Sequence, residues 1–300
     1  MTMRIAGMAS DELEAYLRAG EIVRSLKSSV ATRIRAGARL IDLASFVEEE
    51  TLRMDARPAF PCNISVNAIA SHYTPSPTCP RMLEKGDVVK VDLGAIVGGY
   101  IADSAFTAEV ETAVHQDLIE AANEALSRAV EAVHPGVTTS EIGRTISAVA
   151  SAHGFRVLKD LYGHNMCRNC LHGGLTIPNY DDGSARKIRE GDVLAIEPFL
   201  TAGRGEISRN PGGNIFQVIR KDAFYATGAG EKEMLQRLNR DYTGFPFTVR
   251  WLGADTAALQ GLIRSAAVKE YPMLVEKDGA PVSQAEHTLI VTREGCKIIT

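Results

Sequence analysis

The sequence lacks long apolar runs, has few aromatic residues and carries little excess charge of either sign. No apolar segment approaches the length of about eighteen residues that typifies a membrane-spanning helix, so we predict no membrane span. Lysine and arginine number 33 against 37 aspartates and glutamates, a net charge of −4, which gives no overall basic footprint for nucleic acid. The first residues contain no apolar central stretch, and we expect no secretion signal.

Cysteine is scarce as well. The five cysteines form an odd and scattered set, at positions 62, 79, 167, 170 and 296. In a chain of this length without a signal peptide they indicate cytosolic thiols and not a disulfide framework. Cys167 and Cys170 have the spacing of a redox or zinc motif, but a zinc finger would need a second such pair, which the sequence does not contain. We interpret the pair as unligated thiols near a functional loop.

The composition is otherwise that of a folded protein, with 45% hydrophobic and 23% charged residues. A length of 300 residues allows one large domain or two modest ones. Apolar residues at helical spacing predict one helix that begins after Ser10 as its N-cap, and three more over residues 40–54, 116–133 and 139–153. β-rich runs cover residues 87–97, 99–110 and 192–200.

The most informative pattern is an internal repeat. Leu83–Asp92 parallels Ile188–Glu197, since each segment has a Gly-Asp pair followed by an apolar run that ends in an acid. Upstream, Gly37 and Gly136 precede helices with matching spacing. We infer two halves with a shared helix–helix–strand plan. One repeat is too few for a solenoid, so the pattern favours a pseudo-twofold α+β domain.

Residues from about 208 to 270 have no counterpart in the first half. Two helical runs, 231–240 and one near 256–269, indicate a helical insert in the second half. We therefore predict a main domain of residues 1–207 and 271–300, and an insert subdomain of residues 208–270.

Two aspartates lie in apolar β runs, where an unpaired carboxylate is costly. Between Asp92 and Asp103, Gly98 and Gly99 predict a hairpin turn. A loop of Val97 and Gly98 would place the two carboxylates directly opposite each other, whereas a loop of both glycines would make them diagonal neighbours on one face. Opposed carboxylates repel, and a shared proton or a bound cation would relieve the repulsion. The other interpretation is a pair of exposed edge carboxylates.

The repeat adds a third acid, because Glu197 has in the second half the position of Asp92 in the first. Of the seven histidines, His72, His164 and His172 lie in loop-like settings. Several carboxylates with one or two imidazoles suit divalent Mn, Co, Fe or Zn. More than two carboxylates indicate two ions with bridging ligands, the arrangement that makes and aims a hydroxide nucleophile.

With these residues in view, the chain resembles the methionine aminopeptidases, specifically the type II branch in its archaeal form, nearly end to end. The motifs that carry the resemblance are Ala70–Pro75, Lys90–Gly94, Gly99–Ala105, Gly163–Asn165, Leu171–Gly174, Ala195–Phe199 and Gln284–Thr288. The resemblance implies a pita-bread fold, whose two similar halves accord with the repeat. It also implies five ligands for two divalent metal ions: Asp92, Asp103, His164, Glu197 and Glu286. Periodicity does not point to Glu286.

By the same resemblance, the expected function is removal of the N-terminal methionine from nascent proteins with a small second residue. The expected step is attack by a hydroxide that two metal ions hold. Glu197 is expected to accept and return the proton, and His172 to donate a hydrogen bond to the oxyanion. His72 would contact the substrate across the cleft. The implied walls of the methionine pocket are Phe60, Leu171 and Phe247.

Other functions on this fold stay open. Proline-specific aminopeptidases and creatinase-like hydrolases usually carry an additional N-terminal domain, for which there is no room before the first helix. A non-catalytic pita-bread binding module would have lost its ligands, whereas all five are present here. The ligand set does not choose between Co, Mn, Fe, Ni and Zn. We expect a cytoplasmic monomer. Association with the ribosome is left open, since the sequence shows no identifiable basic patch.

Overall fold

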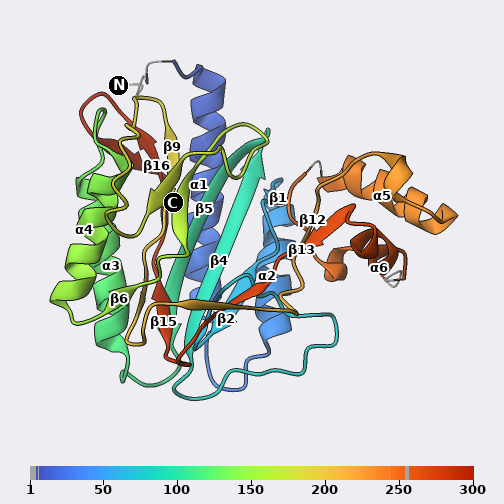
Figure 1. Cartoon of the computed structure of the whole chain (residues 1–300), viewed down its shortest axis with the longest axis horizontal. Coiled ribbons are helices and arrows are strands. Elements are labelled where there is room, and N and C mark those ends of the chain that lie inside the picture. Colours follow the sequence, from blue (N-terminus) through green and yellow to red (C-terminus); the bar gives the residue numbers. More distant parts are fainter. Residues whose placement is uncertain (1–4, 6, 243, 254–256) are drawn as a thin grey trace.

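A computed structural model describes residues 5, 7–242, 244–253 and 257–300. In the main body, α1 (Ser10–Ala31) and α2 (Leu40–Arg53) lie against the central strands, and α3 (Gln116–Glu131) and α4 (Thr139–Ala152) lie at one side (Figure 1). A smaller lobe at the opposite side carries α5 (Ala229–Tyr242) and α6 (Ala257–Arg264). No helix within the described ranges is long and apolar enough to cross a membrane.

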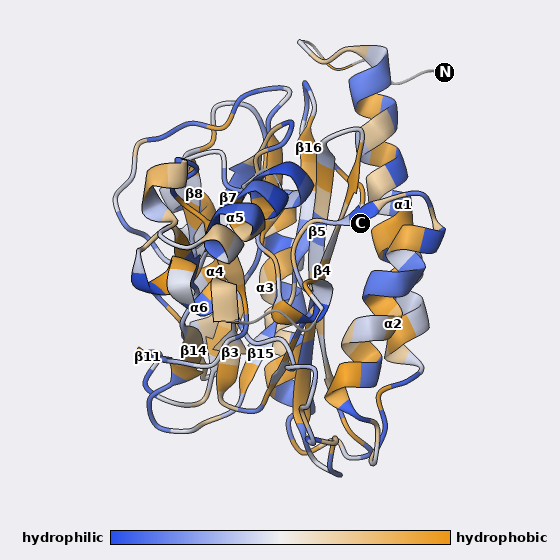
Figure 2. Ribbon diagram, turned by 90° about the vertical axis from the view of Figure 1, so that its right-hand side faces the viewer, coloured by the Kyte–Doolittle hydropathy of each residue, from blue (hydrophilic) through white to orange (hydrophobic). Residues whose placement is uncertain are grey.

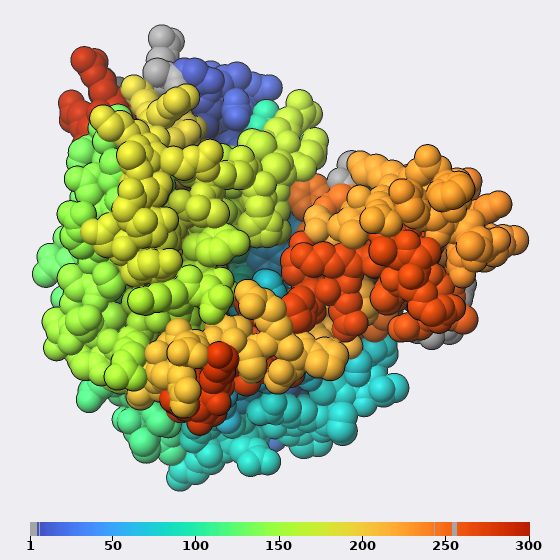
Figure 3. Space-filling view, viewed as in Figure 1, coloured from blue at the N-terminus to red at the C-terminus, as the bar shows by residue number. Residues whose placement is uncertain are grey.

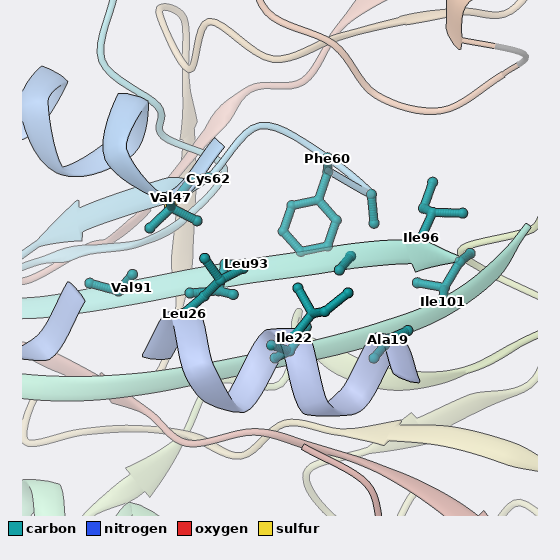
Figure 4. Packing of buried hydrophobic residues seen from close by; sticks show 14 of the residues in the cluster. Ala19, Ile22, Leu26, Val47, Phe60, Cys62, Val91, Leu93, Ile96 and Ile101 are labelled. Atoms are coloured by element: carbon teal, nitrogen blue, oxygen red, sulfur yellow. The ribbon is translucent and has the colours of Figure 1, made fainter. Parts of the chain in front are cut away.

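The first half is built on a long antiparallel hairpin of β4 (Val88–Val97) and β5 (Tyr100–Glu109), with β1 (Arg57–Pro58) and β2 (Asn63–Val66) paired to β4. Ile22 and Leu26 of α1 are fully buried against these strands (Figure 4). Figure 2 shows α1 and α2 on the same side of the hairpin. Each large aliphatic side chain buried here contributes roughly 1.5–3 kcal/mol, so the helices fix one face of the hairpin and leave the other to the second half.

The second half has a five-stranded sheet in the order β17–β16–β9–β7–β8. Its strands are β7 (Tyr162–Met166), β8 (Thr176–Pro178), β9 (Val193–Ile196), β16 (His287–Val291) and β17 (Cys296–Ile298). A separate apolar cluster joins this sheet to α3 and α4, through residues such as Ile142 and Ile146. The helix pair therefore covers the second sheet as α1 and α2 cover the first.

The two halves repeat the same backbone hydrogen bonds, which confirms the predicted pseudo-twofold α+β plan. Gly37 N donates to Leu83 O at 2.8 Å, and Gly136 N donates to Ile188 O at 2.9 Å. Further along, the amides of two glycines with φ of 91° and 88° donate in the same way, Gly86 to Val110 at 2.8 Å and Gly191 to Val291 at 3.0 Å. Both glycines adopt the left-handed conformation that other residues rarely reach.

Short strands connect these parts. They are β3 (Ile69–Ser71), β6 (Arg156–Val157), β10 (Phe199–Thr201), β11 (Ile207–Asn210), β12 (Phe216–Val218), β13 (Val268–Glu270), β14 (Met273–Glu276) and β15 (Val282–Gln284). β11, β14 and β3 form one small sheet and β15, β10 and β6 another, while β12 pairs with β13. With α5, α6 and the 3-10 helices η1 (Ala223–Tyr225) and η2 (Val249–Trp251), the β12–β13 pair encloses its own apolar cluster. The subdomain boundaries at 208 and 270 stay a prediction.

Three local predictions were wrong. Ser10 is not the N-cap: the helix already includes it, and the cap residue is Ala9, which makes no side-chain cap. The predicted strand 192–200 is interrupted after Ile196 because Pro198 has no N–H to donate. The helix predicted near 256–269 ends at Arg264, and its first predicted residue, 256, lies outside the described residues. Strand β13 follows soon after Ala266, a residue with positive φ. The insert is therefore partly β and not purely helical.

A buried ion pair ties the small lobe to the first half. Arg250 in η2 bonds the carboxylate of Glu48 in α2, and the two side chains are only 6% and 8% exposed. Trp251 Nε1 also donates to Glu48 at 2.8 Å, and Arg250 Nη1 donates to Thr74 Oγ1 at 3.0 Å. Burial raises the pKa of Glu48, while the Arg250 charge opposes that rise. Loss of either partner would leave a buried charge without compensation.

We predict that Arg250→Ala destabilises the protein by about 3–5 kcal/mol, because it leaves the buried carboxylate of Glu48 without its cationic partner. Chemical denaturation followed by circular dichroism measures this loss. Arg204→Ala is the control, since Arg204 pairs with Asp278 on the exposed surface and its removal should change stability little. Equal stability of the two variants would contradict a structural role for the buried pair.

Candidate metal centre

The register of the β4–β5 hairpin decides how its two aspartates lie. Asp92 is opposite Ala105 and Asp103 is opposite Gly94. The loop is therefore Gly98–Gly99, both with positive φ, and not Val97–Gly98. Asp92 and Asp103 are diagonal neighbours on one face of the hairpin, the second of the two predicted registers.

The second half brings its acids to the same place. Glu197 directly follows β9, and His164 in β7 pairs with Ala195 of that strand. Glu286 directly precedes β16, and its amide donates to Ala105 O in β5 at 3.1 Å. Thr288 Oγ1 accepts from Asp103 N at 2.8 Å and donates to Asp103 O at 2.7 Å. The strands of the two halves thus meet edge to edge, with the acids at the junction.

These side chains form one compact cluster. His164 Nε2 lies 3.6 Å from Asp103 Oδ2 and 3.7 Å from Glu197 Oε1. One ligand atom each of Asp103, His164 and Glu286 lies within 4.8 Å of the others. The Gln284 amide donates to Asp92 and to Glu286, at 3.3 Å in each case. The amide therefore holds two carboxylates side by side.

The electrostatics of this cluster call for a cation. Burial raises the pKa of Asp103 to about 7. For Asp92, Glu197 and Glu286, burial first, and then the charges of the other acids, raise the pKa well above its usual range. Oδ1 of Asp92 and of Asp103 are buried without a hydrogen-bond partner in the described part of the chain. Carboxylate and imidazole ligands around such atoms fit divalent metal ions.

One lysine already offsets part of this charge. Burial lowers the pKa of Lys27 in α1 to about 8, although Glu286 and Asp92 act to raise it. Its Nζ donates to Ser104 Oγ at 2.7 Å, and that hydroxyl donates to Glu286 O at 2.5 Å. A single ammonium group cannot neutralise four carboxylates, so room for further positive charge remains.

The two other predicted histidines border the cluster. The rings of His172 and His164 are in edge contact, with centroids 4.4 Å apart. Burial lowers the pKa of His172 to about 3 and that of His72 to about 4, so both are neutral near pH 7. The His72 ring lies 5.3 Å from that of Tyr271, and its backbone has a positive φ of 61°. A neutral imidazole can both donate and accept a hydrogen bond.

The candidate ligands, the two further histidines and Tyr271 line a cavity of about 490 Å³. It opens between the small lobe and the main body, where Figure 3 shows a hollow. Sequence-predicted residues in its lining are His72, His172, Phe60, Leu171 and the five candidate ligands. Phe247 is not among the described lining residues; it is fully buried in the lobe and stacks on Tyr242 at 5.1 Å. Its neighbour Pro246 lines the cavity instead.

Three contributors were missed by the sequence reading: Lys27, Gln284 and Tyr271. The position of Gln284 could have been predicted from its spacing. It lies two residues before Glu286, and a strand places such residues on the same face. Lys27 lies four residues after buried Val23, which would place it on the apolar face of its helix. Tyr271 had no such signal, since only the tertiary fold brings it beside His72.

The cysteine pair lies in a tight turn beside the site. Cys167 and Cys170 exchange backbone hydrogen bonds of 3.0 and 2.9 Å, and Asn169 N between them donates to Gly99 O at 2.7 Å. Cys170 Sγ also donates to His172 O at 3.3 Å. All five cysteines are free. The pair thus lies beside the candidate site, where the sequence placed it, and its unligated state stays a prediction.

Comparisons with known proteins place the chain among metallopeptidases. The model of metallopeptidase family M24 matches residues 14–256. A methionine aminopeptidase of Thermococcus onnurineus is 41% identical over 297 residues, which cover 97% of this chain and 100% of that protein. A thermophilic Arx1 superposes with a TM-score of 0.83 at 20% identity, over 98% of this chain and 91% of that one. A methionine aminopeptidase of Thermotoga maritima superposes with a TM-score of 0.73 at 24% identity, over 99% of both chains. These structural likenesses confirm the pita-bread fold.

We predict that the metal-free protein loses stability as the pH rises from about 6.5 to 8. Raised carboxyl pKa values mean that the folded state binds more protons than the unfolded state, so stability falls as the pH passes the folded value, about 7 for Asp103. The lowered pKa values of the histidines have the opposite effect on stability, but only below about pH 6.5, the pKa of histidine in the unfolded chain. Scanning calorimetry in EDTA measures the slope. The Asp103→Asn substitution should flatten this slope of stability against pH, and added Mn²⁺ should reduce it. A stability that does not change with pH in EDTA would contradict the raised carboxyl pKa values.

Proposed function

The chain belongs to metallopeptidase family M24, and we propose on this basis that it is a metal-dependent methionine aminopeptidase. The observation that carries the proposal is the 41% identity to an archaeal methionine aminopeptidase along nearly the whole of both chains. A proline-specific enzyme of the same fold is not favoured, because relatives at 36–41% identity are methionine aminopeptidases. A non-catalytic module is not favoured either, since all five candidate ligands are present.

Within that function, two divalent ions are held by Asp92, Asp103, His164, Glu197 and Glu286. Support comes from the position of all five at one cavity and from the two buried carboxylate oxygens that lack a hydrogen-bond partner within the described residues. Four carboxylates carry four negative charges, which two divalent ions balance. When bound, such ions lower the pKa of a water molecule and polarise a carbonyl oxygen.

Glu197 is the residue that accepts and returns a proton at its carboxylate. Its side chain is 13% exposed, against 6% for Asp103, and it lines the cavity. It is also the acid that directly follows β9, where the strand is interrupted before Pro198. Its carboxylate is therefore more open to substrate than Asp103, the other acid that His164 contacts. General acid–base catalysis of this kind contributes roughly 10²–10⁴-fold.

The neutral histidines orient the substrate. His172 donates a hydrogen bond to the oxygen of the scissile carbonyl, and His72 contacts the substrate from the opposite wall. The low pKa values of both rings keep them uncharged, so neither repels the metal ions. Because a fixed donor needs no reorganisation during the reaction, it stabilises developing negative charge efficiently.

The substrates are N-termini of nascent proteins in which a small residue follows the methionine. Phe60 and Leu171 form apolar walls for the methionine side chain, as cavity-lining residues next to the carboxylates and to His172. Phe247, which does not line the cavity, acts on this pocket through its neighbour Pro246. Since nascent chains emerge from ribosomes, the enzyme works in the cytoplasm, near ribosomes. It acts as a monomer.

The function is tested by metal loading and by methionine release together. Protein stripped with EDTA and reloaded with Mn²⁺ or Co²⁺ should bind two ions per chain and release methionine from Met-Ala-Ser, whereas the stripped protein should not. Mass spectrometry of bound metals counts the ions. Release with a single ion would overturn the two-ion arrangement, and a fully loaded protein that releases no methionine would overturn the function itself.

Replacement of Glu197 by Gln should leave a folded protein whose kcat is about 10²–10⁴-fold lower. The reason is the loss of the proton-accepting carboxylate, and metal analysis must accompany the assay because Glu197 is also a candidate ligand. The matched control is Glu206→Gln, at an exposed surface pair with Lys277 outside the cavity lining, which should keep normal kcat. A near-normal kcat in the Glu197 variant would remove this residue from the mechanism.

A further inference from the structure

Lys269 is a cavity-lining cation that has no acidic partner among the residues the structure describes. Apart from the candidate metal ligands, the carboxylates and cationic side chains in the lining are Asp160, Arg209 and Lys269. Arg209 Nη2 lies 3.5 Å from Asp160 Oδ1, so these two compensate each other. Within the described ranges no carboxylate lies within ion-pair distance of Lys269, which is exposed. The wall of the cavity therefore carries one unbalanced positive charge.

The strand pair of the small lobe aims this lysine at the substrate side of the cavity. Lys269 in β13 is opposite Gln217 in β12, while its neighbour Val268 points into the apolar cluster of the lobe. Its Nζ lies 4.4 Å from the centroid of the Tyr271 ring. Tyr271 is itself fixed, because its hydroxyl donates to Gln217 Oε1 at 2.6 Å.

This arrangement puts the ammonium group one ring away from a substrate histidine. The Tyr271 ring contacts both Lys269 and His72, and its centroid lies 5.3 Å from that of the His72 ring. The charge of Lys269 also acts to lower the pKa of both His72 and His172, although burial is the larger cause for each. Lys269 is therefore near both histidines and outside the carboxylate cluster.

The direction of the substrate follows from the proposed function, on which this inference rests. The methionine amine faces the carboxylates, the scissile carbonyl faces His172, and the rest of the chain leaves past the histidines. The residue that follows the small second residue then comes close to Lys269. The metal ions balance the four carboxylates of the cluster. The positive charge of Lys269 therefore stays available for a carboxylate of the substrate.

We propose that Lys269 is a specificity-determining residue that favours substrates with a carboxylate just beyond the second residue. The carboxylate comes either from an acidic third residue or from the free C-terminus of a short peptide. A partly exposed ion pair of this kind corresponds to about a two- to fivefold difference in kcat/KM. It should weaken with added salt, because salt screens exposed charges.

The experiment compares the metal-loaded enzyme on five peptides with a small second residue. Met-Ala-Glu-Gly, Met-Ala-Gln-Gly and Met-Ala-Lys-Gly, all C-terminally amidated, report on the third residue, and Met-Ala as free acid or amide reports on the terminal carboxylate. The wild type should prefer Glu over Gln and Gln over Lys, or the free acid over the amide. Lys269→Gln should bring these ratios close to one, and Lys269→Glu should invert them.

The charge reversal separates recognition from a structural role, because a merely distorted cavity would lower all rates without inverting a preference. The matched control is Lys232→Gln, which removes an exposed lysine of α5 outside the cavity lining and should keep the wild-type ratios. Equal kcat/KM on all peptides in the wild type, or a preference that survives in Lys269→Glu, would overturn the proposal. Failure to release methionine from any peptide would instead overturn the proposed function.

Discussion

Mutual repulsion among four buried carboxylates is the constraint on which the rest of this structure depends. Each acid is costly to ionise in an apolar surrounding, and together they raise one another's pKa. Two groups of fixed position partly offset this repulsion. They are the ammonium group of Lys27 behind the cluster and the side-chain amide of Gln284, which bonds two of the acids. These partners hold the geometry but do not balance the charge. The remaining imbalance makes the cluster a strong ligand for divalent cations.

The duplicated architecture explains how so many acids come to one point. Each half supplies a strand pair with its helices on the outer side, so the side of the strands that carries the acids has no helices. Asp92 and Glu197 occupy equivalent places, but their hairpins differ: the first turns at two glycines, whereas the second is opened by the long segment from β10 to β15. That segment carries the small lobe, which closes one side of the cavity and supplies Tyr271 and Lys269. Duplication thus brings Asp92 and Glu197 to the cavity, and the inserted segment lines its other side.

Sequence reasoning reached the elements whose signals are local. The Gly98–Gly99 turn predicted the hairpin, and the repeat predicted the place of Glu197. Glu286 came only from the family resemblance, because its carboxylate joins the site through a contact with β5 that no periodicity reveals. Tyr271 and the lobe strands were missed for the same reason, whereas helical spacing from buried Val23 could have pointed to Lys27. Ser10 failed as an N-cap although its residue type suited the role, since cap position depends on backbone conformation as much as on the side chain.

The contact between Asp103 and Thr288 spans 185 residues of chain. During synthesis from the N-terminus, the first hairpin and its helices exist long before β16 is available to complete the site. The half-built protein therefore holds two aspartates in a partly formed pocket without their final partners. Long-range contacts of this kind form late and slow the folding of a domain. The cluster of acids is accordingly complete only after nearly the whole chain has been made.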